Sequence, residues 1–106
     1  MATIEQFKDL ELKIAKITEA KNHPDADRLL VLTVDVGGST KQVVAGIRGA
    51  YEPSDLVGRS VVVVNNLDPA TIRGIESQGM VLCAQAEDGL TLLSTDRPVP
   101  EGAAVR

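Results

Sequence analysis

The sequence predicts an all-β domain, and three observations point to this fold class. The apolar residues make up 43% of the chain and are mostly valine, leucine, isoleucine and alanine, with Phe7 and Tyr51 the only aromatic residues. Branched aliphatic side chains suit the half-buried surface of a pleated sheet. Several short apolar or alternating segments are separated by turn-forming residues, as strands are. At 106 residues the chain has room for a single domain, which we place at residues 1–106.

Three strands are expected in the first half of the chain. Leu10 to Ala15 alternates apolar and polar residues, the pattern of a strand with one buried face. The loop Lys21 to Asp27 contains a proline that fixes φ, and asparagine and aspartate side chains that cap backbone amides. Leu29 to Val36 is a second strand, apolar on both faces for most of its length. Paired glycines in Gly37 to Thr40 favour a hairpin turn, so Lys41 to Ala45 returns as the third strand.

A helical turn and further strands are expected in the second half. Tyr51 to Gly58 has a proline near its start and a glycine at its end, which fits one short helical turn. Ser60 to Asn66 contains four consecutive valines and predicts a strand buried on both sides. Met80 to Gln85 is the fifth strong strand, after a brief pairing at Ile72 to Ile75. Leu90 to Leu93 is the last segment with strand character.

Five or six short strands, with one helical turn between the third and fourth, are the pattern of a five-stranded Greek-key OB barrel. A six-stranded sandwich is the alternative that the same pattern allows. We expect Phe7 to lie in the core. The segment Val99 to Val105 contains alternating apolar residues. A small barrel does not supply enough surface to bury them, which favours a homodimer.

Composition limits the function classes. The net charge is −4, from 11 Lys and Arg against 15 Asp and Glu, so the total charge does not indicate a nucleic-acid partner. Nine of the eleven basic residues lie between Lys8 and Arg73, which leaves room for a basic face on an acidic body. Cys83, the only cysteine, sits in an apolar run and is expected to be a buried, inert thiol. Without a long apolar stretch or a signal peptide, the sequence favours the cytoplasm and no membrane contact.

The residues give little support to catalysis or to metal binding. His23 is the only histidine, and Asp25 and Asp27 are the only carboxylates near it that could share a cation. We prefer the interpretation that this segment is a surface turn whose acidic groups accept hydrogen bonds from backbone amides. Ser77 has no second histidine to act as its base. We therefore predict no catalytic residue, no metal and no cofactor.

Three blocks of sequence, in order, resemble one known family. They are Asn22-His23-Pro24-Asp25-Ala26-Asp27-Arg28-Leu29 with Val34-Asp35-Val36-Gly37, Val44-Ala45-Gly46-Ile47 with Leu56-Val57-Gly58-Arg59, and Asn66-Leu67 with Arg73 to Leu82. The set, which covers about Phe7 to Gly102, resembles the tRNA-binding domain at the C-terminus of many methionyl-tRNA synthetases. The same domain occurs in free-standing tRNA-binding proteins and in the endothelial monocyte-activating polypeptide group.

The resemblance implies an OB barrel, often a homodimer, that binds tRNA by its overall shape and delivers it to an aminoacyl-tRNA synthetase. By position, the binding surface would involve the loop Asn22 to Arg28, the second and third strands, and the corner Ser77 to Met80. A secretion-chaperone branch of the same fold differs at this corner and at Pro24 to Leu29. A protein-interaction module, either a dimerisation domain or a chaperone-like peptide binder, is the alternative function.

The scarcity of aromatics narrows the expected binding mode. Proteins that bind single strands stack bases on aromatic side chains, and this chain cannot build such a platform. Recognition would then rest on phosphates, 2′-hydroxyls and shape, with little sequence preference. The five Lys and Arg residues among the predicted site residues are candidate phosphate ligands, or else solvated charges. Ser77 and Met80 are included as site residues only because of the resemblance. The predicted site residues are Lys21, Asn22, Arg28, Lys41, Arg48, Asn66, Arg73, Ser77 and Met80.

Overall fold

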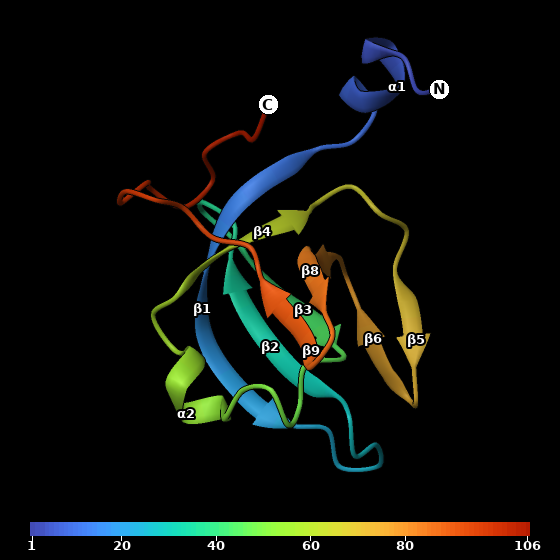
Figure 1. Cartoon of the computed structure of the whole chain (residues 1–106), viewed down its shortest axis with the longest axis vertical. Coiled ribbons are helices and arrows are strands. Elements are labelled where there is room, and N and C mark those ends of the chain that lie inside the picture. The colour runs from blue at the N-terminus through green and yellow to red at the C-terminus, as the bar shows by residue number, and fades with distance from the viewer.

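Five antiparallel strands form the main sheet of the protein, in the order β3-β2-β1-β4-β7. The computed structural model describes residues 1–106, and Figure 1 shows how the main sheet curls. The elements in chain order are α1 (Ile4–Lys8), β1 (Leu12–Asn22), β2 (Leu30–Asp35), β3 (Thr40–Ala45), α2 (Pro53–Leu56), β4 (Ser60–Val64), β5 (Ala70–Ile72), β6 (Ile75–Ser77), β7 (Met80–Val81), β8 (Cys83–Ala86) and β9 (Gly89–Leu92).

The nearly closed sheet confirms the OB-type barrel and not the six-stranded sandwich. Helix α2 lies between β3 and β4, as expected. Its first residue is a proline, whose missing N–H costs nothing at a helix start. Strands β2 and β3 fall within a residue of their predicted limits. The barrel interior is apolar, and its buried residues are Ala15, Ile17, Leu30, Leu32, Val34, Val36, Val43, Ala45, Ile47, Leu56, Val61, Val63 and Val81.

Strand β1 is longer than the sequence pattern predicts. Its first half pairs with β4 and its second half pairs with β2, with an irregular register between Ile17 and Glu19. Such a bulge bends a strand, and the bend allows β1 to pair with both β4 and β2 around the barrel. Lys21 and Asn22, which we expected in a loop, pair with the start of β2 instead. Pairing with β2 therefore overrides the local turn signal at these two residues.

The C-terminal tail covers the outside of β1 and β4. Val99, Ala103 and Val105 pack there on a second apolar cluster, formed by Leu12, Ile14, Val62 and Val64. Backbone hydrogen bonds join the tail to β1 as well: the Ile14 N–H donates to the Ala103 carbonyl at 2.9 Å. These side chains are partly covered within the chain, so the tail does not by itself require a second subunit.

Two glycines hold the tail against the β2–β3 turn. A Cβ on Gly37 would lie 2.7 Å from the Cα of Gly102 and 3.0 Å from the Glu101 carbonyl oxygen. Real Cβ atoms do not approach backbone this closely, so the tail reaches the turn only because neither residue has a side chain. Gly37 also has φ +94°, in the left-handed region.

Side chains from the last residue of β6 and the residue after it bind the edge of β3. The Gln42 N–H donates to Gln78 Oε1 at 2.9 Å, and the Gln78 N–H donates to the Gln42 carbonyl at 2.8 Å. The Val44 N–H donates to Ser77 Oγ at 3.0 Å. We call these contacts of Gln42 and Val44 with Ser77 and Gln78 the seam. The predicted strand Met80 to Gln85 is interrupted beyond the seam, and β7 and β8 join different sheets.

The expectation that Phe7 lies in the core is wrong. Phe7 lies on α1, which buries none of its residues and stands clear of the barrel (Figure 1). Thr3 and Gln6 form the capping box that begins this unpredicted helix. The brief pairing expected at Ile72 to Ile75 is present, because Ile72 pairs with Ile75, and it extends into the β5–β6 hairpin, whose turn residues Arg73 and Gly74 both have positive φ. None of the helices is long and apolar enough to cross a membrane.

Candidate nucleic-acid interface

His23 organises the loop between β1 and β2. Its side chain is 1% exposed, and its Nδ1 accepts a hydrogen bond from the Asp25 N–H at 3.0 Å. Its Nε2 lies 3.2 Å from the carbonyl oxygen of Ile72, in the β5–β6 hairpin. The loop is an exposed surface turn, as predicted, but the prediction that its carboxylates cap it is wrong, because the buried imidazole accepts the hydrogen bond from the Asp25 amide. No group of three His, Cys, Asp or Glu side chains is placed to hold a metal ion.

Two arginines from outside the loop bind its carbonyl groups. Arg48 Nη1 donates to the Ala26 carbonyl at 3.2 Å and approaches the His23 carbonyl at 3.5 Å. Arg73 Nη2 donates to the Asp25 carbonyl at 3.1 Å. A guanidinium carries five N–H donors, so each arginine retains donors for a further partner.

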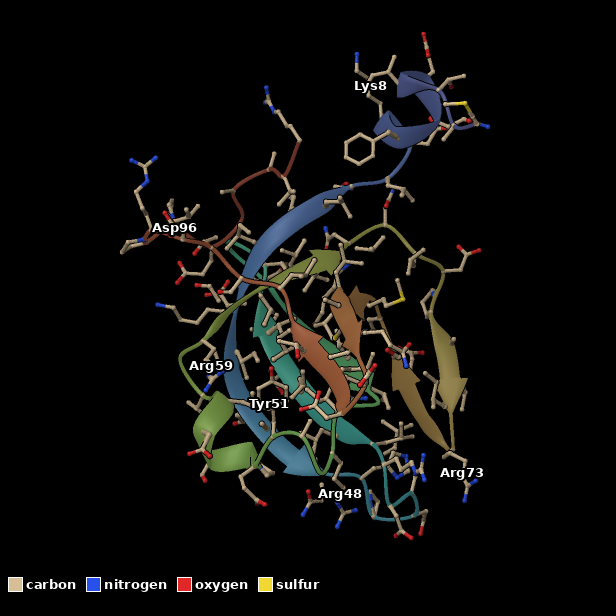
Figure 2. The ribbon with its side chains drawn as sticks, in the orientation of Figure 1. Lys8, Arg48, Tyr51, Arg59, Arg73 and Asp96 are labelled. Carbon is tan, nitrogen blue, oxygen red and sulfur yellow. The ribbon has the colours of Figure 1, made fainter.

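The loop end of the barrel gathers four of the predicted phosphate ligands. Arg48 and Arg73 lie at the same end of the molecule, far from Lys8 on α1 (Figure 2). Arg28 is exposed within the loop, and Lys21 is exposed beside it at the end of β1. We call Lys21, Arg28, Arg48 and Arg73 the basic end. Together with the two loop carboxylates, Asp25 and Asp27, these residues carry a local charge of 4 − 2 = +2 on a chain whose net charge is −4.

Asn22 is exposed at the entry to the loop, whereas Lys41 and Asn66 lie elsewhere. The Lys41 Nζ donates to the Asn65 carbonyl at 2.6 Å, near the start of β1. Asn66 Nδ2 donates to the Asp9 carbonyl, and Asn66 Oδ1 accepts from the Glu11 N–H, both at 2.8 Å. The predicted residues thus do not form one continuous path, because Lys41 and Asn66 are engaged at the opposite end of β1.

Acidic side chains share that opposite end with Lys41. The pKa of Glu11 is lowered by a hydrogen bond from the Asn65 side chain and by the Lys13 ammonium. Lys13 Nζ lies 3.4 Å from Glu11 Oε1. The surroundings of Lys41 are therefore less favourable to phosphate than those of the basic end.

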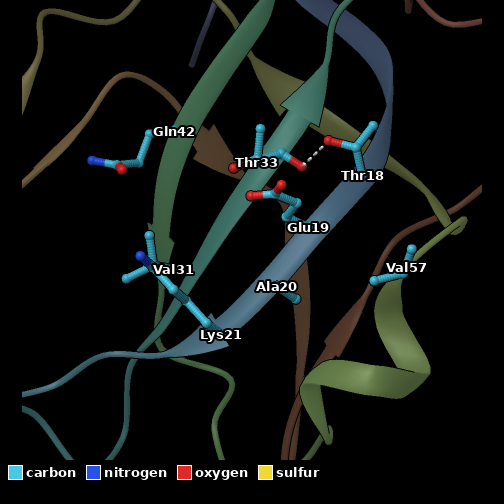
Figure 3. A pocket seen from close by; sticks show the side chains of 8 residues that line it. All are labelled: Thr18, Glu19, Ala20, Lys21, Val31, Thr33, Gln42 and Val57. Atoms are coloured by element: carbon cyan, nitrogen blue, oxygen red, sulfur yellow. Dashed lines mark hydrogen bonds between the residues drawn. The ribbon is translucent and has the colours of Figure 1, made fainter.

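A polar hollow of about 420 Å³ lies on the outer face of β1, β2 and β3, beside the basic end. Figure 3 shows Glu19, Lys21 and Thr33 on its walls, with the Thr18 hydroxyl donating to the Thr33 carbonyl at 3.2 Å. Its hydroxyl, amide and ammonium groups can bind ribose hydroxyls or phosphate oxygens. The sequence analysis did not single out the wall residues other than Lys21, although Thr33 is a polar residue on the otherwise apolar strand β2. The lining residues are Thr18, Glu19, Ala20, Lys21, Val31, Thr33, Gln42 and Val57.

Ser77 and Met80 differ in what they offer a ligand. Ser77 is 4% exposed, and its hydroxyl accepts from the Val44 N–H and donates to the Gly79 carbonyl at 2.9 Å. Both functions of this hydroxyl are used inside the protein. Met80 is 48% exposed and lies over an apolar hollow of about 220 Å³. Cys83 lines the same hollow and is half-buried, and burial raises the pKa of its thiol.

Comparison with known proteins shows which proteins this chain is similar to. A family model described as "Putative tRNA binding domain" matches residues 12–104. The methionine–tRNA ligase of Pyrococcus furiosus is 45% identical over 98% of this chain. A solved structure of a MetRS-related protein from Pyrococcus horikoshii has a TM-score of 0.92 and 32% identity, covering 100% of this chain and 98% of that one. The chaperone CsaA of Bacillus anthracis is 31% identical, with a TM-score of 0.91 and coverage of 100% and 99%.

The share of each relative that this chain covers differs between the synthetases and the smaller proteins. The chain spans only 14% of the Pyrococcus furiosus ligase but nearly all of the two solved proteins. It is thus similar to one module of the synthetases and to the whole of the smaller proteins. The chain belongs to the tRNA-binding domain family, which supplies an accessory module of methionyl-tRNA synthetases.

Proposed function

We propose that this chain is a non-catalytic module that binds tRNA through the basic end and serves an aminoacyl-tRNA synthetase of the methionyl type. The basic end carries this proposal, because four cations gather around one loop of an otherwise acidic protein. The module either belongs to the synthetase chain or acts beside it, in the cytoplasm. In both cases it raises the local concentration of tRNA at the enzyme.

Recognition is proposed to rest on the tRNA backbone and shape, with little preference among tRNAs. The Tyr51 hydroxyl accepts from the Leu92 N–H at 3.1 Å, and the Arg59 guanidinium lies 5.5 Å from the ring centroid. Phe7 stands on α1, away from the basic end. Neither ring is placed to stack bases beside the proposed surface.

Binding to folded tRNA is expected to be weak and to fall steeply with salt. Each neutralised phosphate contributes ~0.7–0.9 to the slope of log affinity against log salt, so a few cations should give a slope of about −2 to −5. Filter binding of bulk tRNA across a salt series measures it. A slope near zero, or preference for an unstructured homopolymer, would contradict the proposal. Binding of an unfolded peptide without tRNA binding would favour the chaperone-like alternative.

Single glutamine variants locate the surface. Lys21→Gln, Arg28→Gln and Arg73→Gln should each weaken tRNA binding and reduce the salt slope by about one contact. Arg97→Gln, Arg106→Gln and Lys41→Gln lose the same charge outside the basic end and should change the affinity little. Exposed substitutions usually alter stability by ~0.5 kcal/mol or less, so thermal melts separate binding from folding. Equal losses in both groups would mean that the proposed surface is wrong.

A homodimer formed through α1 is part of the same proposal. Ile4, Phe7 and Leu10 are exposed and, with Val105, line an apolar hollow of about 330 Å³. A helix of five residues is marginal in water without packing. In a symmetric dimer the same patch of each subunit would cover the other.

Sedimentation equilibrium at micromolar concentration should give twice the 11.2 kDa mass of the chain. Phe7→Asp should reduce the mass to that of the monomer, because it places a charge in the proposed contact. Val57→Asp is the matched control, since Val57 is also an exposed apolar residue but lies on the far side, at α2. A monomeric wild-type protein would refute the dimer.

A further inference from the structure

The loop of the basic end and the β5–β6 hairpin are joined across 49 residues of sequence by the His23 ring. The hairpin is a separate two-stranded sheet with three residues in each strand. Isolated hairpins of this size are marginally stable, so its turn depends on outside contacts. Two hydrogen bonds join the turn to the loop: the His23 ring bonds to Ile72, and the Arg73 guanidinium bonds to Asp25.

The contacts of His23 assign its tautomer. The Asp25 N–H can only donate, so the Nδ1 that receives it carries a lone pair and no proton. The proton of the neutral ring then lies on Nε2, where it donates to the Ile72 carbonyl. Each nitrogen therefore has a distinct partner: Nδ1 shapes the loop, and Nε2 attaches the loop to the hairpin.

We propose that His23, as the neutral Nε2–H tautomer, is a positioning residue for tRNA binding. It attaches the hairpin turn to the loop and so fixes Arg73 relative to Arg28. His23 itself is buried and does not touch the ligand. The inference rests on the proposed function, because it assigns His23 a part in the same surface. Pre-organised cations lose less conformational entropy on binding than mobile ones, so loss of the link should lower the affinity.

Two substitutions separate the roles of the two ring nitrogens. The side-chain oxygen of His23→Asn can take the place of Nδ1 and accept from the Asp25 N–H, but the shorter side chain does not reach Ile72. The side-chain NH₂ of His23→Gln can reach the Ile72 carbonyl but leaves the Asp25 N–H without this acceptor. If the link to the hairpin matters for binding, His23→Asn should lower tRNA affinity more than its effect on the melt explains.

A double-mutant cycle tests whether His23 acts through Arg73. Arg73→Gln should cost about fivefold or more in affinity in the wild-type protein and about twofold or less in the His23→Asn protein. His23→Asn combined with Arg28→Gln serves as the comparison cycle, because Arg28 belongs to the loop itself and should retain more of its effect. Additive effects of His23→Asn and Arg73→Gln would overturn the positioning role while leaving the proposed function intact.

Measurements on the free wild-type protein test the link without tRNA. Nitrogen-15 NMR of the imidazole should show the proton on Nε2, and a proton on Nδ1 would overturn the inference whether or not tRNA binds. His23→Asn should also speed hydrogen exchange in the β5–β6 hairpin while leaving β2 and β3 protected. Absence of tRNA binding by the wild-type protein, by contrast, overturns the proposed function and with it the role of His23 in binding.

Discussion

Gly37→Ala is expected to lower the free energy of unfolding by about 2–5 kcal/mol, as the sum of two costs. The left-handed backbone of Gly37 costs an alanine roughly 1–2 kcal/mol. The new Cβ would also lie within 3.0 Å of two backbone atoms of the tail, and overpacking of this kind adds ~1–3 kcal/mol. Backbone atoms cannot rotate away as a flexible side chain can, so the tail must shift.

Gly38 provides the matched control, because it is the next residue and has a similar φ of +96°, with nothing within 4 Å of the site of a Cβ. Gly38→Ala should therefore cost only the backbone part, roughly 1–2 kcal/mol. Urea denaturation of both variants gives the comparison as a change in midpoint at constant m-value. Equal losses in the two variants would show that the contact between tail and turn contributes nothing.

Ser77→Ala is expected to destabilise the protein by about 1–3 kcal/mol, because it leaves the buried Val44 N–H without an acceptor at the seam. The Gly79 carbonyl loses its donor in the same change. Ser94→Ala is the control: the Ser94 hydroxyl makes one exposed hydrogen bond, to the Ser60 carbonyl, so the change should cost no more than about 1 kcal/mol.

The Ser77 variant also distinguishes a structural from an RNA-contacting role. If the hydroxyl serves only the seam, the folded fraction of Ser77→Ala should bind tRNA with nearly unchanged affinity at a temperature well below its melt. A loss of affinity with little loss of stability would return Ser77 to the binding surface, as the family resemblance implied.

The fold was predictable where local patterns decide it. Continuous apolar runs placed β2 and β4, the paired glycines of the hairpin turn placed β3, and the proline and glycine around α2 limited that helix. The end of β1 was mispredicted because its pairing with β2 overrides the turn signal at Lys21 and Asn22. The β5–β6 hairpin extends the brief pairing expected at Ile72 to Ile75. The cover of the apolar tail could not be predicted, because its partners Leu12 and Ile14 lie about ninety residues earlier in the sequence.

The site was predicted in part. The loop and its neighbouring cations follow from sequence position and resemblance, and four of the five cations do meet at one end. Lys41 lies apart from the other four, and strand parity was sufficient to place it: it shares the core-facing side of β3 with Val43 and Ala45. The role of His23 could not be read from sequence, because one of its two partners comes from a hairpin far along the chain.

The seam affects the tendency of this valine-rich chain to aggregate. Strand β3 ends the main sheet, and the outward amides of such a strand are a template for edge-to-edge aggregation and fibre growth. Here the amides of Gln42 and Val44 already donate to Gln78 and Ser77 side chains. These donors are therefore not free to pair with an extended segment of another molecule. The Gln78 and Ser77 side chains thus protect the β3 edge from aggregation.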